Sequence, residues 1–173
     1  MHQFSELADR SAAFTLNALS EAQTRVMEAL QESGATTLVK SLQMVQLQKV
    51  ISAVGMFSIF EAMLHDVLNC PDGFRGAAEV LTQQRNLDLQ ARFADLQLAI
   101  NVLKHGRGRS YDALVNKAAS LPFKVKLPNE DFFNEGDVGE VSTLVEVDDA
   151  FVLGCADVIR EVSVALGKAG HRL

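Results

Sequence analysis

The segment from Asn101 to Ser110 gathers residue types that can act on a phosphodiester. A histidine can carry a proton to or from a reacting oxygen, and cations can offset the charge that grows on phosphate in a transition state. We therefore interpret the segment as a candidate phosphate-facing site, in which His105 and Asn101 are the candidate catalytic residues. The candidate phosphate-binding residues are Lys104, Arg107, Arg109 and Ser110.

The same residues also have a purely structural interpretation. The C-terminal end of a helix carries a partial negative charge, which stabilises nearby cations by roughly 0.3–1 kcal/mol without any ligand. Lys104 and His105 fall in such a last turn, Gly106 suits the position after it, and Ser110 can cap a short helix that follows. Spacing alone leaves both interpretations open.

Glu61 is a further candidate, because it falls within an apolar helix stripe that should face the core. A carboxylate buried there is costly unless it is paired. His105, Arg92 or Arg109 can provide the partner, in which case Glu61 supports the candidate site. Alternatively, Glu61 lies at the edge of the stripe and reaches water.

Apolar residues recur at helical spacing through most of the chain, and glycine or proline interrupts the pattern between segments. The stripe of the fourth expected helix places Ile100 in the core, whereas Asn101 and His105, four residues apart, share a neighbouring face. The expected helices are about 4–30, 38–68, 74–84, 89–105, 111–119 and, for the last, 149 or 150 to 167 or 170, with Asp88, Ser110 and either Asp148 or Asp149 as N-caps.

Between the last two expected helices the pattern changes from helical to alternating. Residues 123–127 alternate apolar with basic side chains, and 141–147 are rich in β-branched residues, which predicts a small β-hairpin within about 122–147. The acidic segment 130–149 could fold over the basic residues and shield them, or it could be solvated. Together the elements predict an all-α fold: a single domain over 1–173, formed by an antiparallel up-and-down helical bundle with this hairpin before the last helix.

Composition restricts the class of protein. Apolar residues make up 48% of the 173 residues and the formal net charge is −6, which argues against attraction of the whole surface to nucleic acid or anionic membrane. The longest apolar run, Val50 to Phe60, is too short to span a bilayer, so we expect a buried helix segment and no membrane partner. The lack of a signal-peptide pattern and of framework cysteine spacing predicts a reducing cytoplasm. The sequence has no metal-ligand or cofactor motif, so neither a metal nor a cofactor is expected.

Two segments, 55–64 on one helix and 101–110 at the end of a later one, resemble the HEPN superfamily of prokaryotic helical-bundle proteins. The resemblance implies an all-α bundle, usually a homodimer, that often acts as a metal-independent endoribonuclease. It also implies a role in RNA-directed stress, toxin–antitoxin, abortive-infection or other phage-defence systems. The implied partners are a second copy of the chain, an RNA or nucleotide ligand, and an antitoxin protein.

The signature of that superfamily is an Arg, commonly followed by a polar residue such as Asn, with a His four to six positions after the Arg. Asn101 matches the polar position and His105 matches the His, but Ile100 occupies the position of the Arg. An isoleucine cannot donate hydrogen bonds to phosphate, so Arg107 or Arg109 would have to reach the same space. Whether the chain is an enzyme therefore stays open.

Two alternatives remain beside the nuclease interpretation. The chain can be a non-catalytic dimeric interaction module, or a binding partner for nucleic acid or nucleotide, in which the same residues cap a helix. Asn101, Lys104, His105 and Gly106 are also similar to the N-box of histidine-kinase-type ATPases. That fold needs a downstream Asp-x-Gly-x-Gly box, and the segment 137–141 lacks the second glycine.

Overall fold

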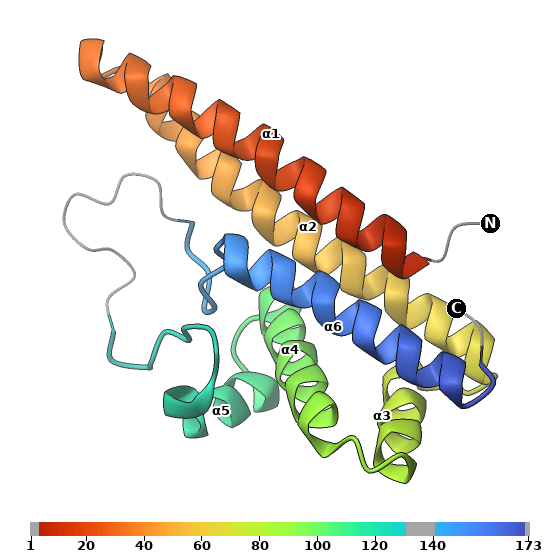
Figure 1. Cartoon of the computed structure of the whole chain (residues 1–173). Helices are drawn as coiled ribbons and strands as arrows, with labels where there is room; N and C mark the ends of the chain where they lie inside the picture. Colours follow the sequence, from red (N-terminus) through yellow and green to blue (C-terminus); the bar gives the residue numbers. More distant parts are fainter. Residues whose placement is uncertain (1–3, 131–140, 172–173) are drawn as a thin grey trace.

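The computed structural model describes residues 4–130 and 141–171, which form α-helices connected by short turns (Figure 1). The all-α fold class is confirmed, because every helix that the periodicity predicts is present. In chain order the elements are α1 (Phe4–Glu32), α2 (Thr36–Leu68), α3 (Gly73–Gln83), α4 (Leu87–His105), α5 (Arg109–Asn116), the 3₁₀ helix η1 (Ala118–Ser120) and α6 (Asp149–Lys168).

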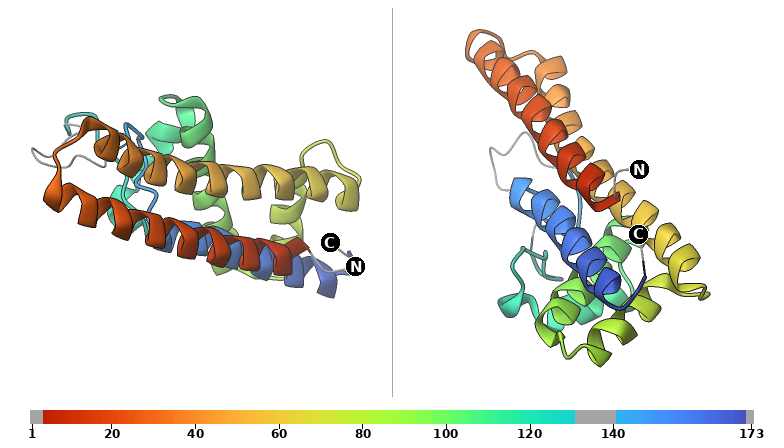
Figure 2. Two further views of the ribbon diagram at one scale, coloured as in Figure 1. Left: turned by 90° about the horizontal axis from the view of Figure 1, so that it is seen from above. Right: turned by 45° about the vertical axis from the view of Figure 1, so that its right-hand side comes forward.

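The two longest helices, α1 and α2, form an antiparallel pair, and α6 packs along both (Figures 1 and 2). The shorter α3 and α4 pack against α2, against α6 and against each other, and α5 packs on α4. The distal ends of α1 and α2 extend beyond the other helices (Figure 1). The buried residues of α1 accordingly lie in its first half: Ser5, Ala8, Ala12 and Leu16.

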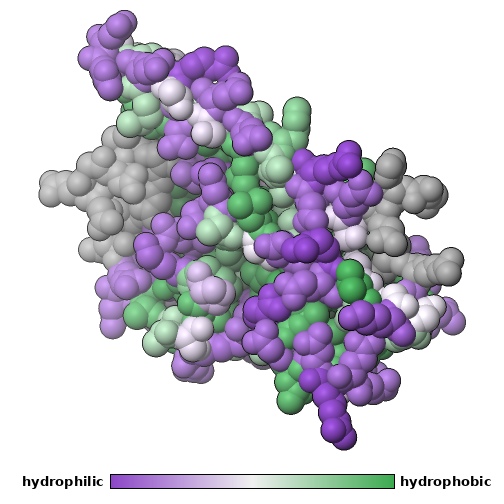
Figure 3. All heavy atoms as spheres, viewed as in Figure 1, coloured by the Kyte–Doolittle hydropathy of each residue, from purple (hydrophilic) through white to green (hydrophobic). Residues whose placement is uncertain are grey.

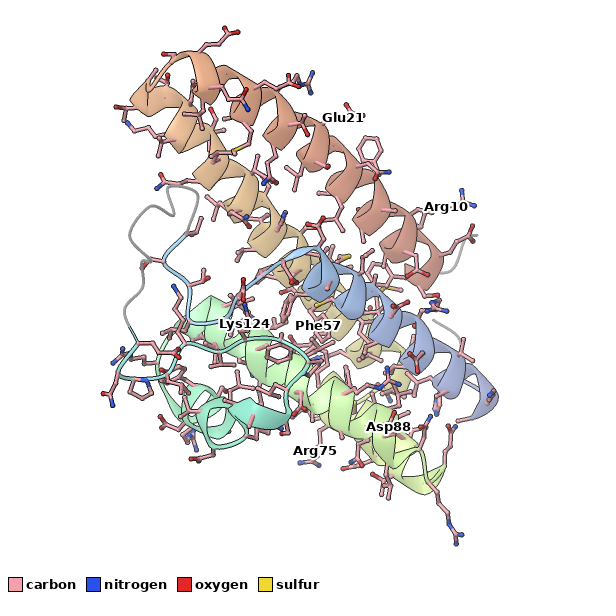
Figure 4. All side chains as sticks on the ribbon, turned by 60° about the vertical axis from the view of Figure 1, so that its left-hand side comes forward. Arg10, Glu21, Phe57, Arg75, Asp88 and Lys124 are labelled. Atoms are coloured by element: carbon pink, nitrogen blue, oxygen red, sulfur yellow. The ribbon has the colours of Figure 1, made fainter. Side chains whose placement is uncertain are left out.

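Phenylalanines from three helices meet in the core. Phe57 and Phe60 on α2, Phe74 on α3 and Phe93 on α4 form four ring pairs with centroids between 5.4 and 6.3 Å apart. Such aromatic pairs contribute about 0.5–1.5 kcal/mol beyond the area that they bury. Figure 4 shows Phe57 in the interior of the bundle. Ile100 is 2% exposed, which confirms that the core-facing stripe of α4 includes it.

Two of the expected N-caps are wrong. α4 begins at Leu87, so Asp88 lies inside its first turn, where it pairs with Arg92 four residues later. α5 begins at Arg109, so Ser110 is already helical. In both places the helix starts earlier than the side-chain signal indicates. Asp88 still suits its position, because a carboxylate in the first turn complements the helix dipole.

The expected β-hairpin is also wrong for the described residues of 122–147, which contain no strand. Val125 and Val145 form one isolated antiparallel bridge, flanked by two backbone hydrogen bonds of 3.0 Å. Both valines are buried in the core of the bundle, so their packing adds to these two hydrogen bonds in holding the segments together. Residues 131–140 lie outside the described residues, and with them most of the expected acidic loop.

α2 is the one described helix that is long and apolar enough to cross a membrane, by length and composition only. The apolar run Val50 to Phe60 at the centre of α2, which we expected to be buried, is buried on one side only. Phe57 and Phe60 are fully buried, whereas Ile51 and Ile59 are 52% and 54% exposed. Figure 3 shows the face of the molecule seen in Figure 1, where hydrophilic side chains are interspersed with apolar ones.

Candidate functional site

The site residues expected from the sequence lie at and around the turn between α4 and α5. α4 ends at His105, and Gly106 leaves the helix at φ +75°, a conformation that glycine adopts easily and other residues rarely adopt. Its amide donates a hydrogen bond to the carbonyl of Val102 at 2.8 Å. A β-carbon at Gly106 or at Gly108 would meet no atom within 4 Å, so the space around the turn is open.

The charged side chains of this turn all face solvent, and they lie within six consecutive residues. Among the described residues, no carboxylate pairs with any of them. Asn101 and Ser110 lie half-buried on either side. The exposed members are Lys104, His105, Arg107 and Arg109, which we call the basic turn.

Tyr111 anchors the basic turn, and no sequence motif singled it out. Its ring is 3% exposed, and its hydroxyl donates a hydrogen bond to the carbonyl of Lys126 at 2.6 Å. The guanidinium carbon of Arg107 lies 5.8 Å from the centre of the same ring, which is a cation–π contact. Tyr111 therefore fixes the start of α5 and keeps an exposed arginine beside the turn.

The structure does not bring Glu61 to the basic turn. Phe60, its neighbour on α2, packs edge to face on Phe93 of α4. His105 lies twelve residues beyond Phe93 on the same helix, or about 18 Å along the axis. Glu61 is half-buried and reaches water, in agreement with the second of the two interpretations considered for it. Arg92, one of its expected partners, pairs with other carboxylates.

Ion pairs join α6 to other helices at two places, to α2 at its first residue and to α4 twelve residues later, and the paired residues are far apart in the sequence. The guanidinium of Arg92 donates two hydrogen bonds to the carboxylate of Glu161, at 2.7 and 3.0 Å, and a third to Asp88 at 3.1 Å. The ammonium of Lys49, which is buried, lies 2.7 Å from a carboxylate oxygen of Asp149. We call these five residues the ion-pair region.

The pairing of Arg92 with Glu161 shifts the pKa values of both groups. The two hydrogen bonds from Arg92 hold the pKa of Glu161 below its ordinary value, although partial burial opposes the shift. The same carboxylate raises the pKa of Arg92 further above its ordinary value, so the guanidinium stays charged. Arg92 and Glu161 also form part of the wall of a cavity of about 300 Å³, whose apolar side includes Phe123 and Phe151.

The described acidic residues before α6 bond locally and not to the basic turn. The carboxylate of Glu130 accepts a hydrogen bond from the amide of Leu127 at 2.8 Å, and Glu146 pairs with Lys124 at 3.1 Å. Asp148 caps α6. The hypothesis that an acidic segment shields the basic turn now depends on residues 131–140, which lie outside the described residues. Residues 137–140 of the segment compared with the ATPase box lie outside them as well.

Within the part of the chain that the structure describes, no three His, Cys, Asp or Glu side chains are placed to hold a metal ion. No protein-family model matches the sequence, and no curated protein or solved structure is significantly similar to the chain. The function must therefore be argued from the chemistry of the basic turn.

Proposed function

We propose that this protein is a HEPN-like, cytoplasmic RNA-binding protein of a stress or phage-defence system, and that the basic turn binds the RNA phosphates. The observation that carries the proposal is the cluster of exposed charged side chains on the basic turn, none paired with a carboxylate among the described residues. Free guanidinium and ammonium groups bind phosphate oxygens strongly, because the hydrogen bonds are charge-assisted.

The charge of the whole chain makes this local cluster significant. A formal net charge of −6 repels a polyanion from the surface as a whole, so an RNA would be held only where cations are concentrated. The open space at Gly106 and Gly108 lets a phosphate approach the backbone closely. Both features support a phosphate ligand more than simple helix capping, which needs no open space.

Binding is better supported than cleavage. The position that the HEPN resemblance assigns to the Arg is Ile100, which is 2% exposed and packed in the core. A side chain in that position faces the core, away from a ligand at the turn. Cleavage would therefore need Arg107 or Arg109 to act together with His105.

The direct test is a binding titration with a short, fluorescently labelled single-stranded RNA. We expect the wild-type protein to bind, and the triple variant Lys104→Ala, Arg107→Ala, Arg109→Ala to bind about 100-fold more weakly. That factor assumes about 1 kcal/mol for each lost charged hydrogen bond. The helical content of the variant, followed by circular dichroism, should be unchanged because the side chains are exposed.

The matched control removes the same number of positive charges elsewhere. The variant Arg25→Ala, Arg85→Ala, Lys168→Ala changes three exposed cations on other parts of the bundle. It should bind RNA within about threefold of the wild type, since only the general charge has changed. Equal losses in the two triple variants, or no binding by the wild type, would contradict the proposal.

The same samples separate binding from catalysis. We expect the labelled RNA to stay intact during prolonged incubation without metal, and His105→Ala to retain its fold and most of its affinity. RNA cleavage by the wild type that disappears in His105→Ala would instead establish the endoribonuclease alternative.

A further inference from the structure

One face of α2 carries large apolar side chains that no described helix covers. Met44, Leu47, Ile51 and Ile59 are 62%, 44%, 52% and 54% exposed. They lie on the side of α2 turned away from Phe60, which is fully buried. Single exposed apolar residues are ordinary, but a run of them along one helix face marks an interaction surface.

This face continues in both directions with residues of other kinds. Lys40 precedes the apolar run, while Ala62 and Asp66 follow it, and all three are exposed. Their helical spacing places them on the same side as Ile51. Among the described residues neither Lys40 nor Asp66 forms an ion pair. We call the whole set the outer stripe of α2: Lys40, Met44, Leu47, Ile51, Gly55, Ile59, Ala62 and Asp66.

Gly55, at the centre of the outer stripe, has no explanation within one protomer. Glycine disfavours the interior of a helix, because it gains no side-chain packing and loses the most backbone freedom. A β-carbon at Gly55 would meet no atom within 4 Å, so the packing of the bundle does not require its absence. A helix from outside that approached α2 closely at this point would require it.

We propose that the outer stripe binds the outer stripe of a second copy, with the two α2 helices antiparallel about a twofold axis near Ala53. This proposal does not depend on RNA binding. In this register each residue of one copy faces a residue of the other copy, and the two residues lie equally far from position 53 on opposite sides of it. The facing pairs are Lys40 with Asp66, Met44 with Ala62, Leu47 with Ile59, and Ile51 with Gly55, and each pair occurs twice.

Charge and size both select this arrangement. The cationic end of one stripe meets the anionic end of the other at both ends of the contact, as a twofold interface requires. Ile51 meets Gly55 and Met44 meets Ala62, so a large side chain faces a small one and the helices can approach closely. Shifting the register so that Ile51 faces Ile51 would leave Lys40 opposite Ala62 and lose both ion pairs.

A membrane is a poorer occupant for the same surface. A helix that spans a bilayer alone is apolar on all sides, whereas the inner side of α2 packs on α1, α3, α4 and α6 and includes Lys49, paired with Asp149. The outer stripe also carries one cation, Lys40, and one anion, Asp66, so an anionic bilayer would gain no net electrostatic attraction from it. A second copy supplies the opposite charge at each end.

The first test is the molar mass of the full chain in solution, measured by sedimentation over a range of protein concentrations. We expect a dimer that becomes monomeric in Ile51→Glu, with a dissociation constant raised about thirtyfold or more. The matched control, Leu87→Glu, alters a residue 61% exposed at the start of α4 and should remain dimeric. Circular dichroism verifies that both variants fold.

The register is tested by charge reversal and by crosslinking. Lys40→Glu and Asp66→Lys should each weaken the dimer about tenfold, and the double variant should restore it. In a Cys70→Ser background, Leu47→Cys combined with Ile59→Cys should form disulfide-linked dimers on mild oxidation. Neither single cysteine should crosslink, because equivalent positions would lie about 18 Å apart along the axis.

Several outcomes would overturn the proposal. A wild-type chain that stays monomeric at every concentration has no such interface. A dimer that survives Ile51→Glu, or that is not crosslinked by the cysteine pair, uses another surface or register. Monomeric chain that floats with vesicles of phosphatidylcholine and phosphatidylglycerol would assign the outer stripe to a lipid surface instead.

Discussion

The basic turn and the ion-pair region contain the same kinds of cation but place them in opposite situations. In the ion-pair region, Arg92 and Lys49 each contact a carboxylate on α6. On the basic turn the cations face water, and no described carboxylate pairs with them. The difference indicates which charges stabilise the fold and which are available to a ligand. The exposure and the pairing of each side chain in the structure distinguish stabilising charges from available ones. The type of residue alone does not distinguish them.

The largest effect on stability should come from removing the partner of the buried lysine. Asp149→Asn leaves the ammonium of Lys49, whose side chain is 9% exposed, without its carboxylate, which is itself 56% exposed. We expect the free energy of unfolding in urea to fall by about 1–3 kcal/mol, because a buried charge loses its compensation. Lys49→Met, which removes the charge itself, should cost less. Equal losses in the two variants would contradict this role for the pair.

A smaller loss should follow from Arg92→Met. The guanidinium makes two hydrogen bonds to Glu161, but both side chains are 39% exposed, so water screens the interaction. We expect about 1 kcal/mol of lost stability by thermal or urea unfolding, near the upper end for exposed ion pairs. A loss above about 3 kcal/mol would show that the pair behaves as a buried one.

The acid side of the stability profile should depend on Glu161. Because Arg92 lowers its pKa in the folded state, this carboxylate contributes stability above its unfolded pKa near 4.5 and loses that contribution as the pH falls. The difference in unfolding free energy between wild type and Glu161→Gln should be constant from neutral pH to about 5 and shrink toward pH 3. An equal difference at pH 3 and pH 7 would exclude the linkage.

The smallest effect on stability should come from the basic turn itself. The triple alanine variant at Lys104, Arg107 and Arg109 should change the unfolding free energy by no more than about 0.5–1 kcal/mol, since it removes exposed charges and one cation–π contact. A loss comparable to that of Asp149→Asn would place the turn among the structural charges. The contrast between the two regions would then disappear.

The sequence predicts local features of this protein better than long-range ones. The helices and the burial of Ile100 follow from apolar spacing, because a helix face repeats every three or four residues. The candidate residues of the basic turn were adjacent in sequence, so their proximity was predictable. The pairing of Arg92 with Glu161 was not, because the two residues are 69 positions apart and only the packing of α6 on α4 joins them.

The incorrect predictions have a similar origin. Asp88 and Ser110 are good capping residues, but each is already the second residue of its helix, because α4 begins at Leu87 and α5 at Arg109. The alternation at 123–127 satisfies the pattern of a strand. Val125 is nevertheless buried by packing on the bundle, and its backbone forms a single isolated bridge and no strand. The local sequence pattern indicates which side chains should be buried. The tertiary contacts decide which secondary structure the buried residues adopt.

The salt dependence of RNA binding tests the central claim, that the basic turn binds phosphate, most directly. Each phosphate held on a single strand contributes a slope of about −0.7 to the logarithm of the binding constant against the logarithm of salt concentration. We predict that replacing Lys104, Arg107 and Arg109 by alanine makes the slope less negative by about 2, since three contacts are lost. An unchanged slope in this variant would contradict the claim.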